Sequence, residues 1–142
     1  MQETFFTSKE ASQITGCTLR QIQYWREKGI VVPVISDKGT GRSIYYSKLN
    51  LVELAAMAYW LSVGISFELA CETLKQLKEQ EPELFTSGKG KRFMLLEAQN
   101  NSLSLVEFDR KRAIACLDQG KPVIPVWLDK IYQSLALKLE TS

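Results

Sequence analysis

Two helix-start signals only eleven residues apart limit how this 142-residue chain can fold more than any other feature of its sequence. Thr7 stands three residues before Glu10, and Thr18 stands three residues before Gln21. A Thr followed at this spacing by Glu or Gln is typical of a capping box, in which two side chains satisfy free backbone N–H groups at a helix start. Gly16 lies between the two signals and can adopt the positive φ of a tight turn. The sequence therefore predicts two short helices joined by a turn.

The second of these helices is predicted to be buried on one side. Leu19, Ile22 and Trp25 recur every three residues, which places them on one face of a helix. We expect this face to lie against Ala11 and Ile14 of the first helix.

The opposite side of the second helix carries polar side chains. Arg20, Gln23 and Tyr24 fall on that side, and Gly29 indicates where the helix ends. Such residue types reach phosphates and base edges in a DNA major groove, so residues 18–28 are predicted to form a recognition helix. An ordinary helical hairpin with a solvated polar face would explain the same residues. The predicted DNA contacts of this helix are Thr18, Arg20, Gln21, Gln23 and Tyr24.

A β-hairpin is predicted directly after these helices. Two runs rich in β-branched and aromatic residues, 34–35 and 44–46, enclose a segment whose Asp37, Gly39 and Gly41 suit a turn. A hairpin beside a recognition helix can act as a wing that lays basic side chains on phosphates or in the minor groove. A basic hairpin tip that only keeps the protein soluble is the alternative. The predicted DNA contacts of this wing, residues 36–46, are Lys38, Arg42, Ser43 and Tyr45.

Two further helices are predicted over residues 49–63 and 66–79. Gly64 and Ile65 separate them, and Ser66 can cap the second. Bulky side chains on the first, such as Met57 and Trp60, could line a ligand pocket. We interpret them instead as core residues of a small helical layer.

The order of these elements resembles the MerR-type winged helix family of transcription regulators. The matching segments are FTSKEASQITGCTLRQIQYWREKGIVVP, GTGRSIYYSKLNLVEL and LSVGISFELACETL, within residues 5–77. The resemblance implies that Arg20 and Tyr24 contact DNA from the recognition helix and that Arg42 does so from the wing. Gln23 stands where the family commonly has arginine, which implies that one phosphate contact is weaker here. The resemblance further implies a symmetric dimer on a pseudo-palindromic DNA site.

The last third of the chain departs from the long dimerising helix that many members of this family have. Two apolar runs, RFMLLEA and SLSLVEF, enclose an Asn-Asn pair at positions 100–101 and predict a second β-hairpin. A helix over 109–117, a strand over 121–126 and a helix over 127–139 are predicted to follow. Pro122 and Pro125 cannot donate ladder hydrogen bonds, so we expect that strand at a sheet edge or only partly paired.

This C-terminal unit of about 53 residues is too small to bury much surface alone. We predict that it pairs with a second chain to form a homodimer; packing on its own chain is the alternative. The predicted dimer contacts are Phe93, Leu95, Leu105, Val126, Trp127, Ile131 and Leu135. The short tail is similar to that of repressors encoded beside CRISPR-associated transposons of cyanobacteria, which repress a Cas effector.

Residue counts argue against several other classes of protein. Histidine is absent and the three cysteines lie far apart, so neither a zinc site nor another cofactor is expected. No nucleophile has a suitably spaced base, so we expect no enzyme activity. Every apolar run is shorter than the roughly 18 residues of a membrane helix, and no secretion signal is recognisable. The sequence therefore predicts a cytoplasmic protein that contacts no membrane.

Charge is distributed unevenly along the chain. Lys and Arg outnumber Asp and Glu by seven to four in residues 1–48 and by nine to six in residues 89–142, whereas residues 49–88 carry two against six. A basic DNA-binding unit beside an acidic helical connector would give this profile, as would a solvated acidic helix pair without a function.

These patterns predict an α+β fold with two parts. A winged helix-turn-helix (α-α-β-β-α-α) is expected over residues 1–85 and a small β-β-α-β-α unit over residues 89–142. The predicted function is a homodimeric, sequence-specific DNA-binding transcription regulator. A repressor is favoured because a long coupling helix and sensor ligands are missing. The alternatives are an antitoxin-like protein whose C-terminal unit binds a protein partner, and an excisionase-like protein that bends DNA for a recombinase.

Overall fold

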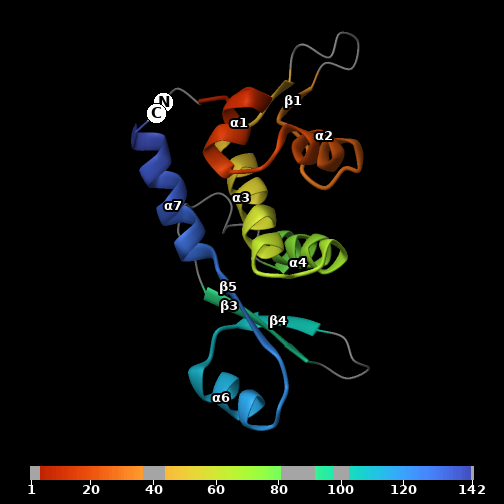
Figure 1. The fold of residues 1–142 in the computed structure, drawn as a ribbon, viewed down its shortest axis with the longest axis vertical. Helices are drawn as coiled ribbons and strands as arrows, with labels where there is room; N and C mark the ends of the chain where they lie inside the picture. Colours follow the sequence, from red (N-terminus) through yellow and green to blue (C-terminus); the bar gives the residue numbers. More distant parts are fainter. Residues whose placement is uncertain (1–3, 37–43, 81–91, 98–102, 142) are drawn as a thin grey trace.

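Helices and short antiparallel strands together build the chain (Figure 1). The computed structural model describes residues 4–36, 44–80, 92–97 and 103–141, and the statements below concern these residues. The elements are α1 Ser8–Thr15, α2 Leu19–Glu27, β1 Ile35–Ser36, β2 Ile44–Tyr45, α3 Lys48–Ser62, α4 Phe67–Gln80, β3 Arg92–Glu97, β4 Leu103–Glu107, α6 Arg110–Asp118, β5 Val123–Trp127 and α7 Leu128–Thr141.

Capping boxes begin both α1 and α2. The N–H of Glu10 donates to Thr7 Oγ1 at 3.1 Å, and the N–H of Thr7 donates to Glu10 Oε1 at 2.9 Å. Thr18 and Gln21 make the same reciprocal pair, with both distances 3.0 Å. Gly16 ends α1 with φ of 82°, in the left-handed region that the turn requires. The predicted starts of the two helices and the turn between them are therefore confirmed.

The buried side of α2 begins one turn later than the sequence predicted. Ile22 and Trp25 are buried, but Leu19 is 54% exposed. Leu19 is the first residue of α2 and directly follows the turn. The prediction that Leu19 faces α1 is therefore wrong, because a period read from spacing takes no account of where the neighbouring helix ends.

The first hairpin is paired as predicted, and the residue after its second strand is hydrogen-bonded to the segment before α1. Ile35 lies opposite Tyr45 in the antiparallel pair β1–β2. Tyr46, which follows β2, exchanges two backbone hydrogen bonds with Phe6, at 2.9 and 2.7 Å. The predicted turn residues Asp37, Gly39 and Gly41 lie outside the described residues.

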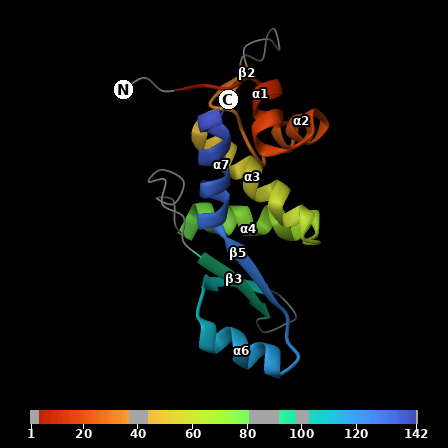
Figure 2. The same cartoon turned by 60° about the vertical axis from the view of Figure 1, so that its left-hand side comes forward.

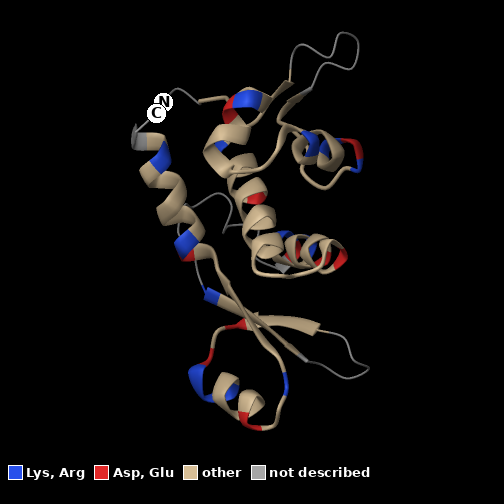
Figure 3. Ribbon diagram, viewed as in Figure 1, with Lys and Arg blue, Asp and Glu red and all other residues tan. Residues whose placement is uncertain are grey.

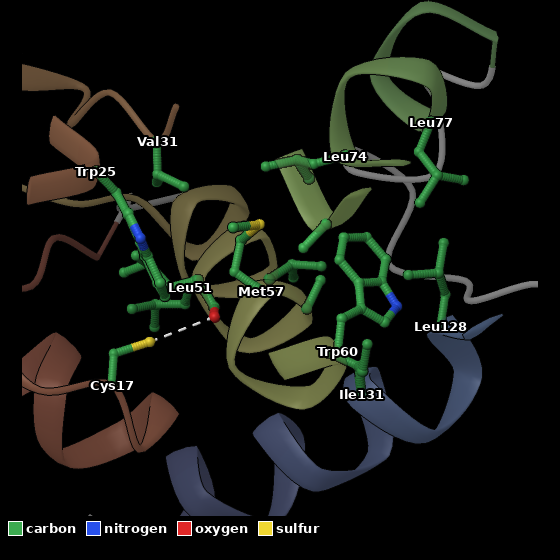
Figure 4. Close-up of a cluster of buried hydrophobic side chains, with 14 of the residues drawn as sticks. Cys17, Trp25, Val31, Leu51, Met57, Trp60, Leu74, Leu77, Leu128 and Ile131 are labelled. Atoms are coloured by element: carbon green, nitrogen blue, oxygen red, sulfur yellow. Dashed lines mark hydrogen bonds between the residues drawn. The ribbon is translucent and has the colours of Figure 1, made fainter. Parts of the chain in front are cut away.

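Helices α3, α4 and α7 meet in the main hydrophobic core. Trp60 of α3 is fully buried, and Figure 4 shows its indole between Leu74 and Leu77 of α4 and Leu128 and Ile131 of α7. The bulky residues of α3 are thus core residues, as interpreted from the sequence. Helix α4 begins as expected, since the Ser66 Oγ accepts a hydrogen bond from the N–H of Leu69.

A three-stranded antiparallel sheet with the order β4-β3-β5 forms the C-terminal part. Phe93 and Leu95 of β3 face the main core, whereas the alternate residues Met94 and Leu96 join a second cluster under α6. Among the described residues, strand β5 pairs with β3 alone, so the expectation of an edge strand at Pro125 is confirmed.

Helix α7 leads back from the sheet to the N-terminal helices and lies along α3 and α1 (Figures 1 and 2). One hydrophobic cluster therefore runs from Phe6 to Leu135. The structure thus shows the arrangement that the sequence left as an alternative, in which the C-terminal unit packs on its own chain.

Candidate nucleic-acid interface

The buried residues of α2 fix the rotation of this helix about its axis. Because Ile22 and Trp25 point into the core, Arg20, Gln23 and Tyr24 project outward. Arg20 lies in the first turn of α2 and Tyr24 one turn further along, so the two side chains belong to one exposed strip. The structure brings these three predicted contacts together on one surface.

Three polar side chains of α2 and its N-cap have partners within this segment. Thr18 and Gln21 are engaged in the capping box, which leaves the Gln21 amide nitrogen available to a ligand. Gln23 Nε2 donates to Glu27 Oε1 at 3.1 Å, one turn away. A phosphate contact from Gln23 would therefore compete with this bond.

Tyr24 links the exposed face of α2 to the start of α4. Its ring lies 5.8 Å from the ring of Phe67, at 45° between the planes. Lys28 Nζ lies 5.6 Å from the Tyr24 ring centroid, within the range of a cation–π contact. The ring is therefore held between α4 and a lysine, although Tyr24 remains 44% exposed.

Asn50 of α3 holds both ends of the first hairpin. Its Oδ1 accepts hydrogen bonds from the N–H of Val34 before β1, at 3.1 Å, and of Ser47 after β2, at 3.0 Å. Its Nδ2 donates to the carbonyl of Val32 and to Glu53 Oε1, both at 3.0 Å. All four hydrogen-bonding positions of the amide are thus filled, at a residue that is buried. This one side chain sets the place of the hairpin relative to α3.

A buried carboxylate extends this network to α4. Glu53 is 6% exposed, and its Oε2 lies 2.8 Å from Lys78 Nζ. The hairpin, α3 and α4 are therefore joined by one chain of polar contacts through Asn50, Glu53 and Lys78. This network is not among the sequence predictions, although Ser47 and Asn50 have the same spacing as the two capping boxes and make a third one.

The predicted wing residues are described only in part. Tyr45 lies on β2 and is 38% exposed. Lys38, Arg42 and Ser43 lie outside the described residues. Their DNA contacts stay predictions.

Charge differs between the helices around this surface. Figure 3 shows basic positions on α2 and mixed charge on α4. The segment made of α2 and its C-cap has three basic residues, Arg20, Arg26 and Lys28, and one acid, Glu27. Helix α4 has the acids Glu68, Glu72 and Glu79 among its described residues. A polyanion is therefore attracted more to α2 than to α4.

None of the groups with a shifted pKa is a residue of α2. Burial raises the pKa of the Cys17 thiol, whose Sγ donates to the carbonyl of Leu54 at 3.3 Å. Burial likewise raises the pKa of Cys71, and it raises the pKa of Tyr132 on α7 to about 12. These cysteines are therefore poor nucleophiles and thiolate donors near neutral pH.

The described part of the chain has neither a cluster of metal ligands nor a membrane-spanning helix. Within it, no group of three or more Cys, Asp or Glu side chains could hold a metal ion. Among the same residues, no helix combines the length and the hydropathy needed to cross a membrane.

The predicted dimer contacts lie mostly inside the chain. Six of the seven are buried among residues of the same chain: Phe93, Leu95, Leu105, Val126, Ile131 and Leu135. Trp127 is partly exposed and stacks edge to face on Phe108, with ring centroids 5.0 Å apart. A contact between chains through the six buried residues would require this core to open, and their part in a dimer stays a prediction.

Comparison with known proteins points to one family. The family described as MerR HTH family regulatory protein matches residues 6–77, about half of the chain. Relatives include an uncharacterized HTH-type transcriptional regulator of Mycobacterium bovis and two proteins of the same description from Mycobacterium tuberculosis. Each is 34% identical over 80 residues, which cover 54% of this chain and 36% of the relative. The chain thus spans about a third of the length of these curated relatives.

Proposed function

This chain belongs to the MerR HTH family of regulatory proteins, and we propose that it is a homodimeric repressor that binds a pseudo-palindromic operator. In this proposal, residues 18–28 enter the major groove as the recognition helix. The wing, residues 36–46, lies on the DNA backbone or in the minor groove. No catalytic step is part of the proposal.

The observation that carries this proposal is the way α2 is anchored. Ile22 and Trp25 hold one side of the helix in the core, so Arg20 and Tyr24 face outward. Arg20 lies in the first turn, the part of the helix that reads base edges in helix-turn-helix proteins. Asn50 fixes the hairpin beside this helix through both of its ends. A recognition helix and a wing held in a fixed relation can contact adjacent grooves at the same time.

Repression is proposed from the absence of a long coupling helix within the described part of the chain. The proposed target is the gene of a Cas effector encoded with a CRISPR-associated transposon, since the C-terminal unit resembles that of such repressors. A reporter transcribed from the upstream promoter should lose activity when the protein is added. Stimulation of the reporter would contradict the repressor role.

Binding to DNA is tested by fluorescence anisotropy with the upstream intergenic duplex and a scrambled duplex, at several salt concentrations. Arg20→Ala should weaken binding to the specific duplex by about 1 to 3 kcal/mol and relax the preference at one base pair, if its guanidinium contacts a guanine. Lys130→Ala is the control, because it removes an exposed basic side chain from α7, outside α2 and the wing. Equal losses on both duplexes for Arg20→Ala would contradict base reading by this residue.

The wing arginine should behave differently from Arg20. If Arg42 contacts phosphates, Arg42→Ala weakens binding to both duplexes alike, and the slope of log K against log salt falls by about one unit. A loss confined to the specific duplex would contradict this division of roles.

A further inference from the structure

Helix α6 has an apolar surface that its own chain leaves open. Ala113 is the buried residue of this helix, whereas Ile114 and Leu117 are 47% and 58% exposed. The two exposed residues are three positions apart and therefore lie on the same side of the helix. A groove of about 320 Å³ runs beside them, between α6 and β5.

The far wall of this groove is rigid and aromatic. Phe108 and Trp127 meet edge to face at 5.0 Å, and both line the groove together with Pro125. The Arg92 guanidinium lies 5.2 Å from the Trp127 ring, and Arg92 Nε is held by Asp129 Oδ2 at 3.0 Å. An aromatic wall fixed before binding loses little conformational entropy when a partner covers it, which is typical of residues that dominate an interface.

The position of α6 suits contact with another chain that also binds DNA. Figures 1 and 2 both place α6 at the end of the molecule opposite α2 and the β1–β2 hairpin. A partner on α6 would therefore leave the recognition helix free.

The charges of α6 complement a second copy of the same helix. Ile114 is the middle residue of Arg110–Asp118. Basic side chains, Arg110 to Arg112, occupy the first turn, and Asp118 occupies the last position. Two such helices packed antiparallel about a two-fold axis would place the basic start of each beside the acidic end of the other, and their dipoles would also oppose.

We propose that two chains pair through α6, packed antiparallel across a two-fold axis at Ile114. Leu117 of each chain enters the groove between α6 and β5 of the other, and Arg110 lies beside Asp118 of the partner subunit. This inference specifies the surface of the homodimer in the proposed function and rests on that homodimer.

The first test is the self-association of Ile114→Glu/Leu117→Glu, measured by sedimentation equilibrium of the full chain. Burial of two carboxylates in the interface should weaken the dimer by at least about a hundredfold. Leu137→Glu on α7 is the matched control, because it places a carboxylate at another leucine that is 65% exposed, and it should leave the dimer intact. Circular dichroism is used to check that both variants are folded. A dimer that persists in the double variant, or one that is lost in Leu137→Glu instead, overturns the proposal.

The second test exchanges the charges at the two ends of α6. Asp118→Arg alone brings arginines together and should weaken the dimer by roughly three- to tenfold, and Arg110→Asp alone should do so to a similar extent. The double variant Arg110→Asp/Asp118→Arg restores opposite charges between chains and should recover most of the loss. Additive losses in the double variant would contradict the antiparallel pairing.

Failure of this inference can be told apart from failure of the proposed function. Binding of Ile114→Glu/Leu117→Glu to a duplex with a single half-site should equal that of the unmodified chain, because α2 is unaffected. An unmodified chain that is monomeric at micromolar concentration yet binds the operator overturns the α6 interface and the homodimer while DNA binding stands. A dimer without DNA binding contradicts the proposed regulator and leaves the interface standing.

Discussion

Arg20 and Trp25 belong to the same short helix but have opposite surroundings, and this contrast defines the candidate site. Trp25 is 2% exposed in the core, and Arg20 is exposed on the outer strip. The types and spacing of these residues predicted both positions. The same reasoning wrongly placed Leu19 in the core, because helical spacing does not show how far along α2 the neighbouring helix extends.

Tyr132 gives a residue-scale prediction about pH. Its pKa is raised by burial from 10.0 to about 12, so the folded chain binds this proton more tightly than the unfolded chain does. The stabilisation that this group contributes is complete below about pH 10 and is lost as the pH rises from there toward 12. Tyr132→Phe cannot ionise, so its free energy of unfolding should fall less steeply with pH in this window. Urea unfolding at pH 8 to 11 measures the difference, and parallel curves for the two proteins would contradict it.

At the scale of the element, helix starts were predicted best. Thr7 and Thr18 were identified from four-residue patterns, since a capping box depends on local contacts alone. The Asn50 network was not predicted, because its partners Val32 and Lys78 lie far from it in the sequence. Contacts of this kind depend on how elements pack, which no local pattern contains.

Asn50→Ala should displace the hairpin as well as destabilise the fold. The substitution removes four hydrogen bonds and leaves buried partners unsatisfied, so we expect a loss of roughly 2 to 4 kcal/mol in the free energy of unfolding. Affinity for the operator should also fall at temperatures where the variant is fully folded, because the wing loses its anchor. Chemical denaturation and anisotropy measure the two effects. Unchanged affinity of the folded variant would show that Asn50 has no part in positioning the wing.

At the scale of the whole molecule, the packing of α7 on the N-terminal helices differs from the leading sequence prediction, which was pairing of the C-terminal unit with a second chain. The spacing of Ile131 and Leu135 predicts the apolar stripe of α7, but a stripe does not identify the surface that it covers. The sequence analysis predicts contacts of this stripe with a second chain, whereas the structure packs it on α3 and α1 of the same chain.

Leu135→Ala tests whether the chain unfolds as one unit. Its side chain is 5% exposed in the cluster shared by α7 and the N-terminal helices, so truncation should cost about 2 to 5 kcal/mol. Unfolding should remain a single transition when followed by tryptophan fluorescence and by circular dichroism, because Trp25 and Trp60 lie in the same cluster. Two separate transitions would show independent domains. Because Leu135 takes no part in the hydrogen bonds of Asn50, the folded variant should keep its DNA affinity, which makes it the stability-matched control for Asn50→Ala.

The position of α7 also has a consequence for synthesis in the cell. The ribosome makes α1 and α3 first, but α7, which covers part of both, is made after the sheet. The apolar side chains of α1 and α3 that α7 covers therefore remain exposed in the growing chain until α7 leaves the ribosome. During this interval the nascent protein is open to chaperones and to aggregation. The final fold is expected to form only after α7 has been translated. We therefore expect the chain to bind DNA only after this helix has been made.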